Sequence, residues 1–335
     1  MTIPFTKMHG LGNDYVYVDA FRHPIPVERH APLARAVSDR HRGIGSDGLI
    51  LIGPPRPGVA ADVRMEMYNA DGSRGEMCGN GIRCVAKYAI EHGLAGREQG
   101  GGDARTICIE TDRGVLETTC FLRGGRVERV RVDMGPPILN PRDIPVAAPG
   151  ECCIQQPLQV GEQRLTMTCV SMGNPHAVFF VEDVAAVDLT HIGPLIERHA
   201  AFPNRVNAHF AQLLSRREAI MRTWERGSGI TQACGTGACA VLVAGVLEDR
   251  LDTTALLHLP GGDLEIEWLR DSATSPSRHS RAADRPSAFP GHDWPGSDAS
   301  DESNPGVNIH GHVFKTGPAV EVFSGVWNDL EDTTP

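Results

Sequence analysis

The sequence predicts a mainly β protein with a few helices, arranged as two similar halves. Runs that favour strands recur between turn residues: YVYVDA near residue 15, VRMEMY near 63, TICIET near 106 and VERVRVDM near 127. An internal repeat divides the chain, because MEMYNADGSRGEMCGNG at 65–81 aligns without gaps on MRTWERGSGITQACGTG at 221–237. Two halves with equivalent strand-to-helix turns indicate a pseudo-twofold molecule with its site at the seam.

Two helices are expected directly after the glycine-rich turns of the repeat. The first follows CGNG, where apolar residues at 82, 85, 86, 89 and 90 have helical spacing and Gly93 is suited to ending the helix. The second runs from about Gly237 to Asp249 and is apolar nearly all round. Such a helix belongs inside the protein, wrapped by strands.

Composition limits the classes of protein to which the chain can belong. Its 335 residues exceed what one core usually organises, so two domains, or two lobes around a shared cleft, are expected. With 41% hydrophobic and 22% charged residues, the chain is an ordinary globular protein, neither disordered nor fibrous. A formal net charge of -10 argues against a nucleic-acid partner, which needs clustered Lys and Arg.

The chain has no apolar run of membrane-spanning length, and its N-terminus has no secretory signal pattern. Its nine cysteines are an odd number, and no spacing matches the CxxC pairs of a zinc site or a redox motif. We therefore expect a cytoplasmic, reducing location, with no membrane partner and no metal site.

Residues 271–308 depart from this globular composition. They are rich in Ser, Pro, Asp, Arg and Gly and contain hardly any aliphatic residue. We expect a solvated insertion without fixed structure. A functional lid or an interaction tail is the alternative, because long loops often carry function. The regular pattern resumes with HVFKTGPAVEVFSG.

Cys78 and Cys234 occupy matching positions in the repeat, in the turns CGNG and CGTG. A helix N-terminus lowers the pKa of a thiol and binds carboxylates, and flanking glycines let a ligand approach the backbone. A lone cysteine is more often a small buried apolar residue. We interpret the others that way: Cys84, Cys108, Cys120, Cys152, Cys153, Cys169 and Cys239. The gapless repeat favours a catalytic pair at 78 and 234, with a structural disulfide as the competing interpretation.

Paired thiols suit stereoinversion at a carbon acid. One thiolate removes a proton from one face, and the other thiol delivers a proton to the opposite face. The two cysteines must titrate as a coupled unit. Without a pyridoxal cofactor, hydrogen-bond donors must stabilise the negative charge that grows on the substrate carboxylate, in a site closed to water.

Several motifs occur in order along most of the chain: MHGLGNDYVYVD, MYNADGSRGEMCGNGIRC, GNPHAVFF, VNAHFAQ, WERGSG and ACGTGACA. This set resembles that of the diaminopimelate epimerases. The resemblance implies an α+β fold of two pseudo-symmetric lobes, each a sheet wrapped round a central helix, with the active site in the cleft between them. The N-terminal lobe would contain residues 1–125 and 317–335, and the C-terminal lobe residues 126–316. The resemblance also implies a homodimeric, cofactor-independent isomerase that converts LL-diaminopimelate to the meso form, for lysine and peptidoglycan synthesis.

By motif position, the resemblance assigns the two bases to Cys78 and Cys234 and places His176 and Glu225 where they support these cysteines. The implied substrate contacts are Asn13, Asn69, Gly79, Asn80, Asn174, Asn207, Glu225, Arg226, Gly235 and Thr236. These residue types suit a substrate that is a zwitterion at both ends, because a guanidinium binds a carboxylate and an amide both donates and accepts. An isolated asparagine is more often a turn residue, and an isolated histidine more often structural, so the assignment depends on the whole ordered set.

The chain departs from the family pattern at Gly48, where some relatives carry a glutamine that helps to hold the distal end of the substrate. The 271–308 insertion is the second departure, and it leaves the motifs intact.

Two other functions remain open. One is a related proline or hydroxyproline racemase, which would leave Arg226 and the extra asparagines without purpose. The other is a non-catalytic amino-acid-binding or redox protein whose cysteines form a reversible disulfide.

Overall fold

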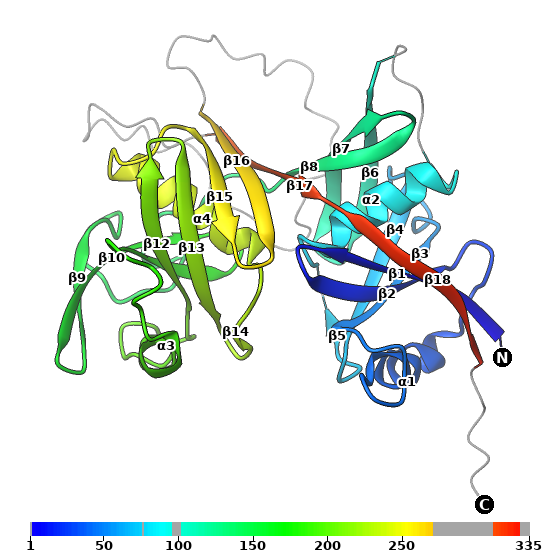
Figure 1. Ribbon diagram of the computed structural model, residues 1–335, viewed down its shortest axis with the longest axis horizontal. Coiled ribbons are helices and arrows are strands. Elements are labelled where there is room, and N and C mark those ends of the chain that lie inside the picture. The colour runs from blue at the N-terminus through cyan, green and yellow to red at the C-terminus, as the bar shows by residue number, and fades with distance from the viewer. Residues whose placement is uncertain (1, 76, 96–101, 271–310, 329–335) are drawn as a thin grey trace, which may run out of the picture. The chain divides into compact units, whose positions relative to one another are not determined.

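The computed structural model describes residues 2–75, 77–95, 102–270 and 311–328, which belong to two compact units. Of the described residues, unit 1 contains those up to Val132 and those from Gly317, and unit 2 contains those from Asp133 to Thr316. The insertion expected at 271–308 lies outside the described residues. Each unit is built mainly from antiparallel strands with two helices (Figure 1).

The sheet of unit 1 has the strand order β18-β1-β2-β3-β4-β6-β7-β8, and the short strand β5 pairs with β4. Two pairs in this order are parallel, β2 with β3 and β4 with β6, and the others are antiparallel. The strands are β1 (Thr2–Gly10), β2 (Asn13–Asp19), β3 (Gly48–Gly53), β4 (Val63–Asn69), β5 (Arg74–Gly75), β6 (Ala104–Thr111), β7 (Gly114–Arg123), β8 (Arg126–Asp133) and β18 (Val320–Asn328).

Unit 2 repeats this order as β9-β10-β11-β12-β13-β15-β16-β17, and its short strand β14 pairs with β13. Its parallel pairs, β11 with β12 and β13 with β15, occupy the matching places. The strands are β9 (Gln156–Val160), β10 (Gln163–Ser171), β11 (Pro175–Phe180), β12 (Asn207–Ser215), β13 (Glu218–Glu225), β14 (Gly229–Ile230), β15 (Thr254–Leu259), β16 (Gly262–Arg270) and β17 (Gly311–Pro318). The repeat seen in the sequence is therefore a repeat of structure.

One helix in each unit is enclosed by its own sheet. Helix α2 (Gly81–Glu91) contacts β1, β2, β3, β4, β6 and β7, and its residues from Gly81 to Ile90 are all buried. Helix α4 (Gly235–Leu247) contacts β10, β11, β12, β15 and β16 and is buried from Gly237 to Gly245. A helix with apolar residues on every side is stable only where all its faces are removed from water. The prediction of buried central helices is confirmed.

The second helix of each unit lies against the other face of the sheet. Helix α1 (Val27–Ser38) packs on β2, β3 and β4, and α3 (Leu189–Glu197) packs on β12, β13 and β14 (Figure 1). Neither was identified from the sequence. Both contain an internal proline, Pro32 in α1 and Pro194 in α3, a residue that usually breaks a helix.

The four strand-like runs all form strands: β2, β4, β6 and β8. The helix expected from about Gly237 begins two residues earlier, at Gly235, and ends at Leu247. The helix expected after CGNG is α2, which ends at Glu91, two residues before Gly93. The sequence pattern was therefore reliable for these four strands and for both enclosed helices.

Truncation of Leu242 in α4 tests the enclosed helix. Leu242 is fully buried, whereas Leu214 in the same unit is 49% exposed. We expect Leu242→Ala to lower the free energy of unfolding by about 2–5 kcal/mol because it leaves a cavity. Leu214→Ala is the control and should lower it by less than about 1 kcal/mol. Urea unfolding followed by circular dichroism measures both variants, and equal losses would contradict the enclosed position of α4.

Candidate active site

Cys78 lies in the turn that leads from β5 into α2. The backbone N–H of Gly81 donates to its sulfur at 3.3 Å, and the Cys78 carbonyl accepts from Ile82 N at 2.9 Å. The thiol donates to Oδ1 of Asn13, at 3.1 Å, from the first residue of β2. The first turn of the enclosed helix thus holds a half-buried thiol against a neutral amide oxygen.

A carboxylate orients that amide. Asn13 Nδ2 donates to Oδ2 of Asp47 at 2.7 Å, so the amide oxygen is turned toward Cys78. Asp47 is held in turn by Arg40, whose Nη2 lies 2.9 Å from its Oδ1. Asp47 was not predicted as a site residue. The only sequence signal is its position in the turn just before β3, beside the Gly48 that was singled out.

Tyr15 is a second residue near Cys78 that the sequence analysis missed. It follows Asn13 by two residues in β2, which places both side chains on one face of the strand. Burial raises the pKa of its hydroxyl above the ordinary value, and negative charge on Cys78 raises it further, so Tyr15 remains a neutral phenol. Gly48 makes room for this ring, because a Cβ there would lie 2.9 Å from Tyr15 Cε1 and would overlap the Tyr68 carbonyl oxygen. A glutamine at position 48 would not fit this arrangement.

The other predicted residues of unit 1 lie in turns near Cys78. The Gly79 carbonyl and Asn80 Oδ1 both accept from Nη1 of Arg83 at 3.1 Å, which pins the turn to α2. Asn69 ends β4, and its Nδ2 donates to Ser73 Oγ at 2.9 Å.

Cys234 occupies the matching position in unit 2, as the N-cap of α4. The Gly237 N–H donates to its sulfur, and Ala238 N donates to its carbonyl at 2.9 Å, as Gly81 and Ile82 do at Cys78. The expectation that the helix N-terminus makes this thiol more acidic is wrong overall. Burial raises the pKa of Cys234 well above its usual range, and the nearby Glu225 raises it further, while the Gly237 N–H lowers it by less.

Glu225 ends β13 beside this thiol. Burial raises the pKa of its carboxyl group, and hydrogen bonds from Thr231 and Cys234 lower it by less. Thr231 Oγ1 donates to Glu225 Oε1 at 2.5 Å. Thr236 Oγ1 lies 3.7 Å from the Cys234 sulfur, on the first turn of α4. Cys234 and Glu225 are therefore a buried pair of acids: Glu225 favours the protonated thiol, and Cys234 favours the ionised carboxyl group.

His176, in β11, is completely buried and lies between two polar partners. Its Nε2 lies 3.0 Å from Asn174 Oδ1, and its Nδ1 lies 2.8 Å from Nε2 of His209. Burial lowers the pKa of His176 well below its usual value, and charge repulsion from His209, when protonated, and from Arg226 lowers it further. Burial lowers the pKa of His209 to about 3. Both imidazoles are therefore neutral at pH 7, and His209 was not predicted from the sequence.

Asn207 and Arg226 are joined at the ends of β12 and β13. Asn207 Oδ1 accepts from the Arg226 backbone N–H at 2.9 Å, and Asn207 Nδ2 donates to the Pro175 carbonyl at 2.9 Å. The exposed Arg226 side chain donates from Nη1 to the Asn204 carbonyl at 2.9 Å. The amide of Asn207 thus fixes the backbone from which the Arg226 side chain projects.

Each unit thus gathers its own share of the predicted site. Unit 1 contributes Cys78 with Asn13, Asn69, Gly79 and Asn80. Unit 2 contributes Asn174, His176, Asn207, Glu225, Arg226, Cys234, Gly235 and Thr236. All nine cysteines are free thiols in the described structure.

The sequence is similar to that of a well-defined protein family. The profile of the family "Diaminopimelate epimerase" matches residues 5–140 and 168–279. A curated diaminopimelate epimerase of Agathobacter rectalis is 47% identical over 328 residues, which cover 96% of this chain and 98% of that protein. The protein of the same name from Moorella thermoacetica is 45% identical, with the same coverage of both chains. The chain belongs to the diaminopimelate epimerase family.

Solved structures with much lower identity share the fold of this diaminopimelate epimerase family member. A probable proline racemase from Agrobacterium radiobacter has a TM-score of 0.62 at 15% identity, covering 99% of this chain and 94% of that one. A PhzF-family phenazine biosynthesis protein from Bacillus anthracis has a TM-score of 0.61 at 14% identity, covering 98% and 99%. The predicted family, the α+β fold class and the assignment to the isomerases are confirmed. Within the described residues, no helix has the length and apolar character needed to span a lipid bilayer.

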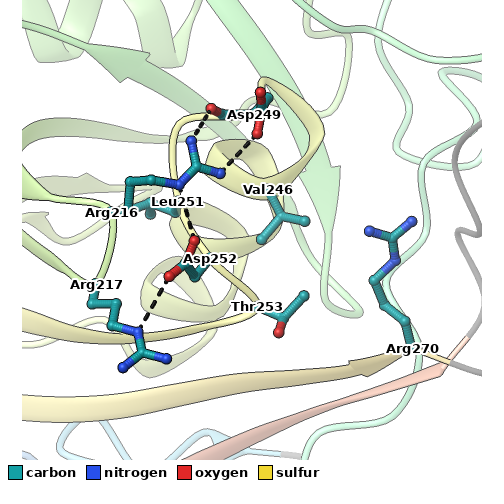
Figure 2. Close-up of a pocket in the computed structure, with 8 residues that line it drawn as sticks. All are labelled: Arg216, Arg217, Val246, Asp249, Leu251, Asp252, Thr253 and Arg270. Atoms are coloured by element: carbon teal, nitrogen blue, oxygen red, sulfur yellow. Dashed lines mark hydrogen bonds and ion pairs between the residues drawn. The ribbon is translucent and has the colours of Figure 1, made fainter.

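A separate cavity of about 390 Å³ lies in unit 2, away from the cysteine turn (Figure 2). Four of its charged residues form ion pairs with one another: Arg216 contacts Asp249 at 2.7 Å and Asp252 at 2.9 Å, and Arg217 contacts Asp252 at 3.2 Å. The remaining lining residues are Val246, Leu251, Thr253 and Arg270. No cysteine or histidine lines it, so this cavity differs in chemistry from the site of this family member.

The two thiols of the site are expected to differ in reactivity. Cys78 is half-buried, whereas Cys234 is only 3% exposed and its pKa is raised. Because thiolate is the reactive form, we expect iodoacetamide at pH 8 to modify Cys78 at least about tenfold faster than Cys234. Raising the pH toward 9 should accelerate the modification of Cys234, because its raised pKa lies above that range. Mass spectrometry of tryptic peptides measures both rates.

Cys84 is the control for this labelling, because it is fully buried and burial raises its pKa to about 11. It should remain unmodified while the protein is folded. Modification of Cys234 at the rate of Cys78, with Cys84 still protected, would contradict the described difference between the two thiols.

Proposed function

We propose that this chain interconverts LL- and meso-diaminopimelate without a cofactor, with Cys78 and Cys234 as the two acid–base groups. The observation that carries this proposal is the duplicated thiol turn. In each unit the N–H three residues after the cysteine donates to its sulfur at the start of an enclosed helix. The curated relatives that cover nearly the whole chain are named diaminopimelate epimerase, which supports the same substrate.

The reaction uses one sulfur as base and the other as acid. For the isomer with which Cys78 acts as thiolate, Cys78 removes the α-proton and the Cys234 thiol protonates the opposite face. The raised pKa of Cys234 suits it to hold that proton in the free protein. In the reverse direction Cys234 is the thiolate that this turnover leaves: it removes the α-proton, and the Cys78 thiol protonates the opposite face. The pair titrates together, since each turnover transfers one proton between the two sulfurs.

The charge that grows on the substrate carboxylate needs fixed donors. The first turns of α2 and α4 supply backbone N–H groups and the positive end of each helix dipole, near Gly79, Asn80, Gly235 and Thr236. The surroundings add little positive charge, because His176 and His209 are neutral. Stabilisation therefore comes from oriented neutral donors in a buried site, where they act strongly.

The distal end of the substrate carries a second carboxylate and a second ammonium group. Arg226 suits the carboxylate, because its guanidinium projects from a backbone that Asn207 holds. Asn69 and Asn174 supply amides that can donate to a carboxylate and accept from an ammonium group. Proline lacks this second head, so the set favours diaminopimelate over the racemase alternative.

Single replacements of the two cysteines test the two-base reaction. We expect Cys78→Ser and Cys234→Ser each to lower kcat by roughly 10³-fold or more, because a hydroxyl is a much weaker acid than a thiol. The measurement is the ¹H NMR signal of the α-proton of LL-diaminopimelate in D₂O, with no added cofactor. Cys108→Ser, which replaces another half-buried cysteine, is the control and should keep full activity. Inversion at the wild-type rate in either site variant would rule out the two-base mechanism. If the wild-type protein inverted proline but not diaminopimelate, diaminopimelate would be ruled out as the substrate.

We also propose that the protein is cytoplasmic, because free thiols indicate a reducing compartment. We propose further that it forms a homodimer. Strand β18 supports the dimer: its partner strand in unit 1 is β1 (Figure 1), and its Val322, Phe323 and Val326 are 53%, 48% and 57% exposed. An apolar strand at a sheet edge is prone to pair unless another surface covers it. A second copy of this chain is the partner we propose.

A charge on β18 should therefore weaken the dimer. We expect Phe323→Glu to shift the protein toward monomer by at least about tenfold in dissociation constant, because a carboxylate would be buried without a partner. Analytical ultracentrifugation across a concentration series measures the shift. Leu214→Glu, at an exposed apolar position of unit 2, is the control and should leave the association unchanged. A monomeric wild-type protein at all concentrations would contradict the proposal.

A further inference from the structure

A continuous chain of hydrogen bonds crosses the interior of unit 2. Thr223 Oγ1 lies 2.9 Å from His209 Nδ1, and His209 Nε2 lies 2.8 Å from His176 Nδ1. His176 Nε2 lies 3.0 Å from Asn174 Oδ1. Both rings are fully buried and Thr223 is 3% exposed, so water does not compete for the bonds that join Thr223, His209 and His176, whereas Asn174 at the end is half-buried. Strand pairing sets this chain, because His209 in β12 lies opposite Thr223 in β13.

The direction of the chain follows from its last member. An amide oxygen can only accept, so His176 must donate its Nε2–H to Asn174 Oδ1. A neutral imidazole carries one ring proton, so His176 Nδ1 must accept, and His209 must donate from Nε2. His209 Nδ1 then accepts the hydroxyl proton of Thr223. Each hydrogen bond points the same way, from Thr223 toward Asn174.

We propose that His209 is a positioning residue: it holds His176 as the Nε2–H form, which locks the Asn174 amide with its NH₂ group free to donate to a substrate carboxylate. This inference rests on the proposed function, in which Asn174 contacts the substrate. If these hydrogen bonds pointed the other way, the Asn174 side chain would present its oxygen to the substrate and would accept from an ammonium group instead. The histidine pair therefore decides which end of an amino-acid head this amide binds.

The same ring also braces the Cys234 turn. A Cβ on Gly237 would overlap Cε1 of His209, so the imidazole packs directly against the first turn of α4. Gly237 is the residue whose N–H donates to the Cys234 sulfur. His209 thus contacts the backbone donor of the thiol on one side and orients Asn174 through His176 on the other.

Ligand atoms of His176, His209 and Cys234 lie within 4.8 Å of one another, so a metal ion has to be weighed as the alternative. Every ring nitrogen of the two histidines already has a hydrogen-bond partner. A metal bound between the rings would replace the proton they share, and a metal at an outer nitrogen would displace Asn174 or Thr223. The hydrogen bonds account for the whole cluster, so the positioning role is favoured.

The tautomers of the two rings give a test that needs no activity. In long-range ¹H–¹⁵N spectra of ¹⁵N-histidine-labelled wild-type protein at pH 7, we expect both rings to carry hydrogen on Nε2 and none on Nδ1. The His209→Gln and His176→Gln variants assign the signals by their loss. A proton on Nδ1 of either ring, or on both nitrogens of one ring, would overturn the proposed direction.

Kinetics of three variants test the effect on substrate binding. His209→Phe keeps an aromatic ring but removes the donor to His176, so we expect KM for LL-diaminopimelate to rise about tenfold, with a smaller fall in kcat. The side-chain NH₂ of Gln can replace the Nε2–H donor, so His209→Gln should restore KM to within about threefold of wild type. The control His258→Gln, at a partly exposed histidine of β15, should be unchanged.

The two proposals fail in different ways. Should wild-type protein not invert diaminopimelate, the proposed function fails, and the ¹⁵N spectra still decide the direction of the chain. Should it invert diaminopimelate while folded His209→Phe keeps the wild-type KM, or while Gln does not rescue, the positioning role of His209 is overturned and the function stands. Thermal unfolding of each variant confirms that it is folded.

Discussion

A helix that begins inside a sheet must find partners for the backbone N–H groups of its first turn, and this constraint shapes both halves of the molecule. The sulfurs of Cys78 and Cys234 each accept one of these hydrogens, from Gly81 and Gly237. The positive end of each helix dipole also attracts anions. Enclosing the helix therefore produces, from one arrangement, a thiol held by a backbone N–H and a turn suited to an anion.

Enclosure also disfavours the thiolate form of the cysteine. A thiolate removed from water is destabilised, and at Cys234 this effect exceeds the help from the helix end, so the pKa rises. The two cysteines have different neighbours. Cys78 donates to the neutral amide of Asn13, which Asp47 orients, whereas Cys234 lies beside the carboxylate of Glu225. A duplicated framework has thus acquired two unlike surroundings for two identical side chains.

Neutral groups make up much of the polar interior of unit 2. Charging His176 or His209 would place a cation in a fully buried position, and burial prevents it by lowering both pKa values. Neutral imidazoles keep a directional hydrogen-bond pattern, which a doubly protonated ring would lose. Hydrogen-bond geometry therefore orients these buried groups, and the guanidinium of the exposed Arg226 provides positive charge beside them.

Local patterns in the sequence predicted strands β2, β4, β6 and β8, both enclosed helices, the repeat and the cysteine turns, because alternation, helical spacing and glycine placement act over a few residues. Helices α1 and α3 were missed since their internal prolines oppose the local signal, and packing against the sheet outweighs it. Asp47, Tyr15 and His209 could not be found this way. Asp47 reaches Asn13 across 34 residues and His209 reaches His176 across 33, through strand pairing that no short segment specifies. The sequence alone determined which residues we propose for the chemistry, and only the tertiary structure decided how each is oriented and buried, because orientation and burial are set by neighbours distant in the chain.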